Sequence, residues 1–278
     1  MKIGLLLIVP ALVLAQAPIH KDQPGAAPVN QGGASEDPLI TRARLAVLHF
    51  IRSLPDFSCD ESVQRWESAT VNPDWKLQDR IAVELLFLHG KEDYRNVRIN
   101  GKPIKKGALG DSGQWSTGEF GSLLADVFSP STHAAFHFAR EAAAGGRASR
   151  VYDFSVTQAN SHWTMRMSYA FRPPYHGSAW IDAQSGQVLR VELRSRAFPP
   201  DYEVNRVEEE VDYEWVTIAG TKYLLPVRSS NLSCSRHSLL CDRNDVEFKS
   251  YRKFAVESQI LPTGDEVTPP ATAIEKPK

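Results

Sequence analysis

The spacing of hydrophobic positions changes along the chain. Over residues 37–54 apolar side chains recur at helical spacing, with Asp37 as a cap, Pro38 in the first turn and Pro55 after the end. Further along, the period becomes two, which predicts strands at 80–90, 91–101, 150–158, 162–171, 177–184, 187–198, 204–220, 221–230 and 245–260. The intervening turns are short, so we expect antiparallel neighbours in a meander.

Alternation is cleanest at residues 187–198 and 204–220. One face of the first strand carries Leu189, Val191 and Leu193, and its other face carries arginines. The second strand has an apolar face of Val207, Val211, Tyr213 and Trp215, and an acidic face of Glu208, Glu210, Asp212 and Glu214. Such a sheet packs against the core on one face and is exposed to solvent on the other. If the strands pair, arginines lie beside carboxylates, so the acidic run is interpreted as a cross-strand ladder and not as a metal or catalytic cluster.

A second helix is predicted over residues 116–128, inserted among the strands. Ser116 and Glu119 have the spacing of a capping box, and Pro130 follows the end. A wide apolar stripe runs along the segment, made of Phe120, Leu123, Leu124, Val127 and Phe128. This helix either packs as ordinary core or forms a lid over a lipid-sized cavity. The elements together predict a mainly β (α+β) fold: a curved antiparallel sheet or half-open barrel with an N-terminal helix and one inserted helix.

The N-terminus predicts export. Residues 1–15 have one lysine, an apolar run and then Ala15, which is the pattern of a signal peptide. We expect cleavage after Ala15, because cleavage after Ala17 would place Pro18 at the new terminus. An uncleaved anchor is the alternative. Cleavage implies a periplasmic or secreted protein with no transmembrane span in its mature form.

The remaining chain is expected to form one domain. Residues 16–38 and 261–278 are rich in Pro, Gly, Ala and polar side chains, so they are predicted to be a flexible linker and a disordered tail around a single β domain at 39–260. The net charge is -1, which argues against binding nucleic acid by bulk electrostatics.

The three cysteines favour one disulfide. Cys234 and Cys241 are seven residues apart, which in an exported protein favours a loop-closing bond. Cys59 is then a buried thiol, although it can instead pair with either of the other two.

No motif in the sequence indicates catalysis or cofactor binding. His133 and His137 have the spacing of a zinc helix, but Ala134 stands where that motif needs glutamate, and a strand is at least as favoured there. On a strand the two histidines would lie about 13 Å apart, too far for one metal. We predict no metal, no cofactor and no enzymatic activity.

Several motifs resemble the LolA/LolB-like superfamily, which includes the lipoprotein carriers and the RseB-like fold. They are the "WID", "AQSGQ" and "VLRVE" run at 180–192, the segment "DYEWVTIAGTKYLLPVRSS" at 212–230, and "YRKF" at 251–254. The chain is also similar to a group of exported bacterial proteins of about this length, a group that supplies no activity. The resemblance spans about residues 56–256, and no residue of a carrier site transfers.

What the resemblance implies is a binding protein of the envelope. The first hypothesis is that the concave face binds a lipid, a lipoprotein acyl chain or another hydrophobic ligand. The lining would then be Leu123, Leu124, Phe128, Ile181, Val191, Leu193, Val211 and Trp215. The alternative is a protein-interaction or sensor module whose sheet interior is filled with side chains. A secreted hydrolase is the third possibility.

Overall fold

The structure of the protein is a computed structural model that describes residues 36–105 and 119–254. The chain divides into two units, Met1–Ser35 and Glu36–Lys278, and all described residues belong to the second. The predicted signal peptide, most of the predicted linker, and the predicted tail lie outside the described residues.

Two α-helices, two short 3-10 helices and thirteen strands make up the described part. The helices are α1 (Pro38–Ser53), α2 (Ser122–Phe128), η1 (Pro130–Thr132) and η2 (Gln158–Asn160). The strands are β1 (Phe57–Ser68), β2 (Lys76–Leu88), β3 (Lys91–Ile99), β4 (Lys102–Pro103), β5 (Ala135–Ala144), β6 (Arg147–Val156), β7 (Met165–Arg166), β8 (Ala170–Phe171), β9 (Tyr175–Asp182), β10 (Val188–Ser195), β11 (Val204–Ile218), β12 (Thr221–Ser235) and β13 (Cys241–Lys253).

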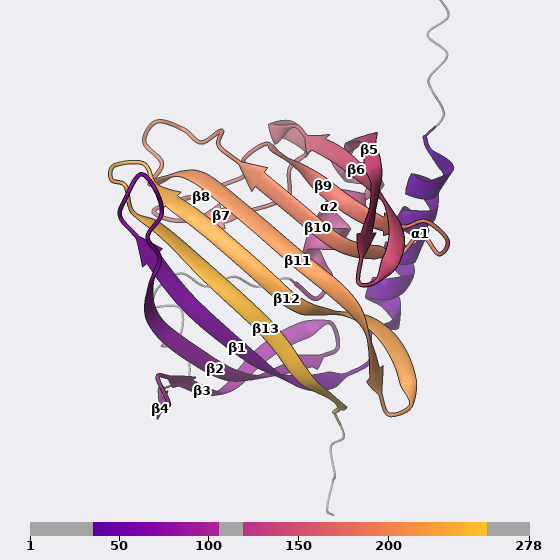
Figure 1. The fold of residues 1–278 in the computed structure, drawn as a ribbon, viewed down its shortest axis with the longest axis horizontal. Coiled ribbons are helices and arrows are strands. Elements are labelled where there is room, and N and C mark those ends of the chain that lie inside the picture. The colour runs from indigo at the N-terminus through magenta and orange to yellow at the C-terminus, as the bar shows by residue number, and fades with distance from the viewer. Residues whose placement is uncertain (1–35, 106–118, 255–278) are drawn as a thin grey trace, which may run out of the picture. The chain divides into compact units, whose positions relative to one another are not determined.

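Eleven strands form one antiparallel sheet in the order β4-β3-β2-β1-β13-β12-β11-β10-β9-β6-β5. Its end strands do not pair with each other, so the sheet is curved but not closed (Figure 1). Both α-helices pack against one face of the sheet, which we call the covered face, and the opposite face is the open face. The predicted fold class, a curved antiparallel sheet with an N-terminal and an inserted helix, is confirmed.

Helix α1 forms as its sequence predicts. The Asp37 carboxylate accepts a hydrogen bond from the backbone N–H of Leu39 at 2.8 Å, and Pro38 occupies the first turn. The buried side chains lie along one stripe and join the core: Leu39, Ile40, Ala43, Val47 and Phe50. None of the helices in the described ranges is long and apolar enough to span a membrane.

The inserted helix is shorter than predicted, and the capping-box assignment is wrong. Helix α2 begins at Ser122, so Glu119 lies in a turn before the helix, and Ser116 is outside the described residues. Gly121 is the cap residue, with φ at 131°, and a Cβ there would lie 3.3 Å from Ile51 Cγ1. The close approach to α1 therefore decides where this helix starts.

The single strand predicted at 162–171 is also wrong. Residues 165–171 instead form a two-stranded hairpin, β7–β8, separate from the main sheet. Its Phe171 packs with Phe198 and Tyr202 in a small second core. The aromatic contacts to Tyr202 outweigh the local alternation that predicts a longer strand.

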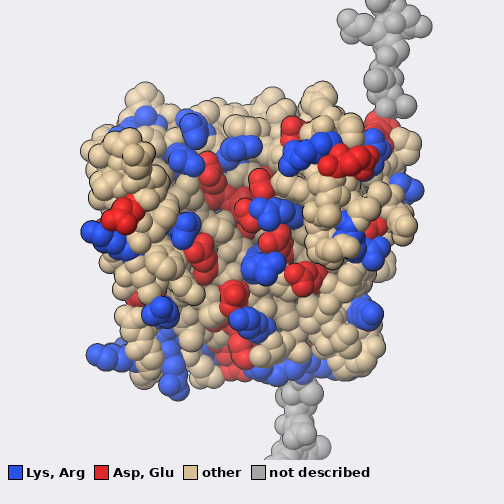
Figure 2. All heavy atoms as spheres, in the orientation of Figure 1, with Lys and Arg blue, Asp and Glu red and all other residues tan. Residues whose placement is uncertain are grey.

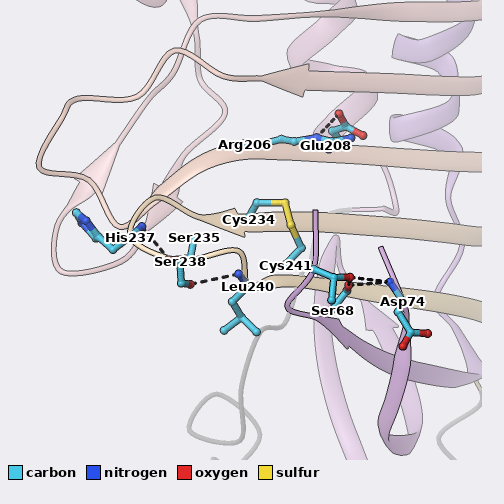
Figure 3. The surroundings of a disulfide bond; sticks show 11 residues. Ser68, Asp74, Arg206, Glu208, Cys234, Ser235, His237, Ser238, Leu240 and Cys241 are labelled. Atoms are coloured by element: carbon cyan, nitrogen blue, oxygen red, sulfur yellow. Dashed lines mark hydrogen bonds and ion pairs between the residues drawn. A yellow bond between two sulfur atoms is a disulfide. The ribbon is translucent and has the colours of Figure 1, made fainter. Parts of the chain in front are cut away.

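The predicted disulfide joins Cys234 to Cys241 (Figure 3). The two residues face each other across β12 and β13, at the end where the β12–β13 loop leaves the sheet. Closing this short loop contributes about 2.5 kcal/mol on the loop-entropy model. Cys59 is free and buried in the core of β1, and burial raises the pKa of its thiol.

Gly177 shows how tightly β9 fits between its neighbours. A Cβ at this position would lie 1.8 Å from the Glu192 carbonyl oxygen and 2.8 Å from the Phe154 ring. Neither contact can be relieved without moving the backbone of β10 or the core.

We therefore expect Gly177→Ala to lower the free energy of unfolding by about 3 kcal/mol, measured by urea denaturation. Gly145→Ala is the control, because nothing lies within 4 Å of a Cβ there and only its φ of +53° is unfavourable. The free energy of unfolding of that variant should fall by only about 1 kcal/mol. Equal losses in the two variants would contradict the steric explanation.

Candidate functional site

Seven of the eight predicted lining residues belong to one buried apolar cluster, to which α2 contributes three and the sheet four. They are Leu123, Leu124, Phe128, Ile181, Val191, Leu193 and Val211, and all are buried. Trp215 does not join them, because it is 45% exposed near the β11–β12 hairpin. The predicted apolar face of β10 and most of that of β11 are therefore found where alternation places them.

Side chains of both helices pack against the covered face of the sheet. Phe50 of α1 packs edge-on against Tyr213 of β11, with ring centroids 6.1 Å apart. The Tyr213 hydroxyl donates to the backbone carbonyl of Glu119 at 3.2 Å, which fixes the segment before α2. Phe128 of α2 stacks on Phe136 of β5 at 5.3 Å. The seven residues are thus packed as core.

A row of polar residues crosses the covered face, and the sequence analysis missed it. Glu209 of β11 pairs with Asn231 of β12, which pairs with Asn244 of β13, which in turn pairs with Arg65 of β1. Asn231 and Asn244 are buried. Because Glu209 stands within the run Glu208–Glu210, its inward position is easily overlooked, yet strict alternation from Val207 and Val211 identifies it.

Two further buried carboxylates lie on the covered face. Glu61 of β1 is 5% exposed, and among described atoms its Oε2 has no hydrogen-bond partner. Glu119 is also buried and accepts a hydrogen bond from Ser229 at 3.4 Å. Burial, followed by repulsion from Glu119 and then Glu92, raises the pKa of Glu61 well above its usual value.

Glu209 is affected in the same way. Burial first and Glu119 second raise its pKa to about 8, partly offset by a hydrogen bond from the Trp163 indole. A carboxyl group with this pKa is largely protonated at neutral pH. The polar row consequently adds little negative charge to the interior.

The open face is charged and hollowed (Figure 2). One hollow of about 240 Å³ is lined by Ser62, Gln64, Glu210, Asp212, Arg228, Ser229, Ser230, Asp245, Val246 and Glu247. A second of about 250 Å³ is lined by Trp75, Glu192, Leu193, Arg194, Glu208, Glu209, Glu210, Ser230, Leu232 and Arg243. Because the two hollows share Glu210 and Ser230, they adjoin along the centre of the sheet.

The predicted cross-strand ladder between β10 and β11 is confirmed. Arg190 pairs in register with Asp212, and its guanidinium contacts Glu210 at 2.6 Å, Glu192 at 2.7 Å and Asp212 at 3.3 Å. Glu192 and Glu210 face each other directly, so Arg190 offsets a like-charge pair. Burial nonetheless raises the pKa of Glu210, against the opposing effect of Arg190.

Aromatic side chains hold arginines near the hollows. The Arg243 guanidinium lies 4.7 Å from the Trp75 ring centre and 5.6 Å from that of Trp66. It also pairs with Asp245 at 3.2 Å. Trp180 is flanked in the same way by Arg140 and Arg190. These stacked arginines are rigid, which reduces the entropy lost when a partner contacts them.

The histidine pair lies apart from these features. His137 is in strand β5, and His133 precedes it in a left-handed conformation. Across the residues that the structure describes, no group of three or more His, Cys, Asp or Glu side chains is arranged to hold a metal ion.

No family model and no curated protein match the chain. Solved structures do. The LolA superfamily protein NE2245 of Nitrosomonas europaea is 9% identical, with 79% of this chain and 93% of that chain covered and a TM-score of 0.33.

Two other solved structures are similar over comparable lengths. A DUF1329 family protein of Desulfovibrio piger is 8% identical, with 79% of this chain and 95% of that chain covered and a TM-score of 0.35. The MucA/MucB complex of Pseudomonas aeruginosa contains a chain that is 11% identical, with coverage of 79% and 100% and a TM-score of 0.24. At such identities and TM-scores, these similarities carry no argument about ligand or partner.

The raised pKa of Glu209 predicts how stability depends on pH. Its folded pKa, about 8, lies above the ordinary 4.5, so its stabilising contribution is present below pH 4.5 and is lost as pH rises through about 8. Glu209→Gln should abolish this loss, making the variant about 4 kcal/mol less sensitive to pH than the wild type between pH 5 and pH 9. Urea denaturation at pH 5 and pH 9 measures it.

Glu208→Gln is the matched control, because Glu208 is the neighbouring residue and faces the open side. If both variants or neither changed the pH dependence, the inward position of Glu209 would not be its cause.

Proposed function

We propose that this protein is an exported, non-catalytic binding protein of the cell envelope, and that it binds a partner protein through the open face. The observation that carries the proposal is that the covered face is already filled by α1 and α2. The face of the sheet that is available to a partner is then the open face.

The chemistry of the open face supports protein recognition. Its hollows adjoin across β10, β11, β12 and β13 and combine carboxylates, serines, arginines and an indole. Rigid aromatic and arginine side chains with polar surroundings are typical of protein interfaces. An acyl chain, by contrast, would leave the charges of this surface without water or ion partners.

Export is the second part of the proposal. It rests on the signal-peptide pattern of residues 1–15 and is in keeping with the disulfide between Cys234 and Cys241. In a reducing cytoplasm such a bond would rarely persist.

A bulky residue at the shared floor of the hollows tests the partner site. Ser230→Tyr should lower cross-linking of the protein to an envelope partner by about tenfold, because the ring occupies space that the partner needs. The measurement is chemical cross-linking in cells followed by mass spectrometry of the adducts.

Asn205→Tyr is the matched control, since Asn205 is exposed at the start of β11 and lines neither hollow. Both variants should keep the thermal midpoint of the wild type. If cross-linking to the partner were lost equally with both variants, or retained with both, the result would contradict an open-face site.

Binding of a lipid or acyl chain on the covered face is the second candidate function. It is favoured by one observation: seven of the eight predicted lining residues converge in one apolar cluster formed by α2 and the sheet. For a chain to enter, α2 would have to leave this cluster, and the chain would then meet the polar row at Glu209 and Asn231.

We therefore expect no saturable binding when a fluorescent fatty acid is titrated into the purified protein, and no lipid adduct in native mass spectrometry. The physical reason is the cost of exposing the α2 contacts, about 2 kcal/mol for each large apolar side chain uncovered. A stoichiometric lipid adduct would instead support carriage and overturn the open-face assignment.

A further inference from the structure

Helix α1 has a second apolar surface that is exposed to solvent. Leu45, Leu48 and Ile51 are 63%, 43% and 37% exposed, although the same helix buries five other apolar residues against the sheet. At 3.6 residues per turn, steps of three residues keep these side chains on one side of the helix. Leu45 and Leu48 lie on the side away from the buried Ala43 and Val47, whereas Ile51 lies at the edge of this surface, beside Gly121.

The exposed side of α1 is also positively charged. Residues 38–53 contain Arg42, Arg44 and Arg52 and no carboxylate. Arg44 is engaged, because it pairs with Glu36 at 2.9 Å and donates to the Phe128 carbonyl at 2.6 Å. Arg42 and Arg52 are exposed, and within residues 36–105 and 119–254 neither forms an ion pair.

The arginines and the apolar residues interleave on this surface. Viewed down the helix axis, Arg52 falls between Leu45 and Leu48, and Arg42 lies on the flank beyond Leu45, with His49 between them. Apolar side chains mixed with unpaired arginines suit an anionic bilayer, where the leucines enter the acyl boundary and the guanidinium groups contact phosphates. A protein partner with an apolar groove would have to supply carboxylates at the same positions.

We propose that α1 is the surface by which this protein docks on an anionic phospholipid bilayer. The helix is already held by its buried stripe and its Asp37 cap, so docking requires no folding of the helix. Helix α1 lies on the covered side of the sheet (Figure 1), whereas the hollows are lined by residues of the opposite face. Docking therefore leaves the open face accessible. Membrane docking is a role in addition to the proposed function and does not depend on it.

Vesicle co-sedimentation tests the proposal with the exported chain as purified, its N-terminus determined by mass spectrometry. We expect binding to vesicles of equal parts phosphatidylglycerol and phosphatidylcholine, and not to vesicles of phosphatidylcholine alone. Binding should weaken as salt is raised, because the arginine contacts are screened. All variants share one N-terminus, so a difference between them reports on α1.

Two double variants separate the apolar and the charged contributions. Leu45→Ser with Leu48→Ser should reduce the affinity for the anionic vesicles by about tenfold or more. Arg42→Gln with Arg52→Gln should reduce it by about fivefold for each charge. All four positions are exposed, so the thermal midpoint should not change.

Controls of the same chemistry lie elsewhere on the protein. Val71→Ser with Leu239→Ser removes two exposed apolar residues outside α1, and Arg98→Gln with Arg166→Gln removes two exposed charges. Neither control should alter binding. Equal losses in controls and α1 variants, or binding without preference for phosphatidylglycerol, would overturn the proposal.

The same variants identify the competing occupant. If sedimentation equilibrium showed a concentration-dependent dimer that Leu45→Ser with Leu48→Ser abolishes, the stripe would be an interface between two copies and the bilayer assignment would be wrong. Ser230→Tyr should leave vesicle binding unchanged, so failure of this proposal and failure of the partner site are distinguishable.

Discussion

The covering of one sheet face by α1 and α2 is the constraint on which the rest of the structure depends. An eleven-stranded sheet that curves without closing exposes an apolar face too large to remain in water. Phe50, Phe128 and their neighbours fill that face, and the Tyr213 hydroxyl ties the segment before α2 to the sheet. Once this face is filled, the positions available for recognition are the open face and the outer side of α1.

The interior is not uniformly apolar, which limits what it can hold. The row from Glu209 to Arg65 places amides, a carboxyl group and a guanidinium across four strands. Arg65 pairs with Asp79, and the Glu209 carboxyl is largely protonated at neutral pH, so burial is tolerated without an isolated charge. A continuous channel for an acyl chain would have to pass these groups. The polar row and the packing of the helices both argue against an acyl-chain channel in the interior.

Much of the fold follows from local sequence rules, whereas the site depends on tertiary contacts. The Asp37 cap and the alternation of Leu189, Val191 and Leu193 act within a few residues, so they predict α1 and β10 correctly. The start of α2 depends instead on how closely Gly121 approaches Ile51, a contact between segments about 70 residues apart. The hairpin β7–β8 depends on Tyr202 in the same way. Glu209 is a different case, because alternation does place it inward, but its acidic neighbours suggest a single solvated face.

Helix α1 packs against the sheet with one side and exposes apolar residues and arginines on the other. Its buried stripe is wide enough to hold it on the sheet, so Leu45 and Leu48 are not needed for folding, whereas Ile51 also approaches Gly121 before α2. Exposed apolar residues are common singly, but three on one side of a helix without a carboxylate form a patch with a defined charge. Replacing Leu45 and Leu48 by serine should therefore cost little stability, and any function they have must be sought in what the helix touches. Export, as proposed from the signal-peptide pattern of residues 1–15, would make a bilayer surface the neighbour that such a helix meets first.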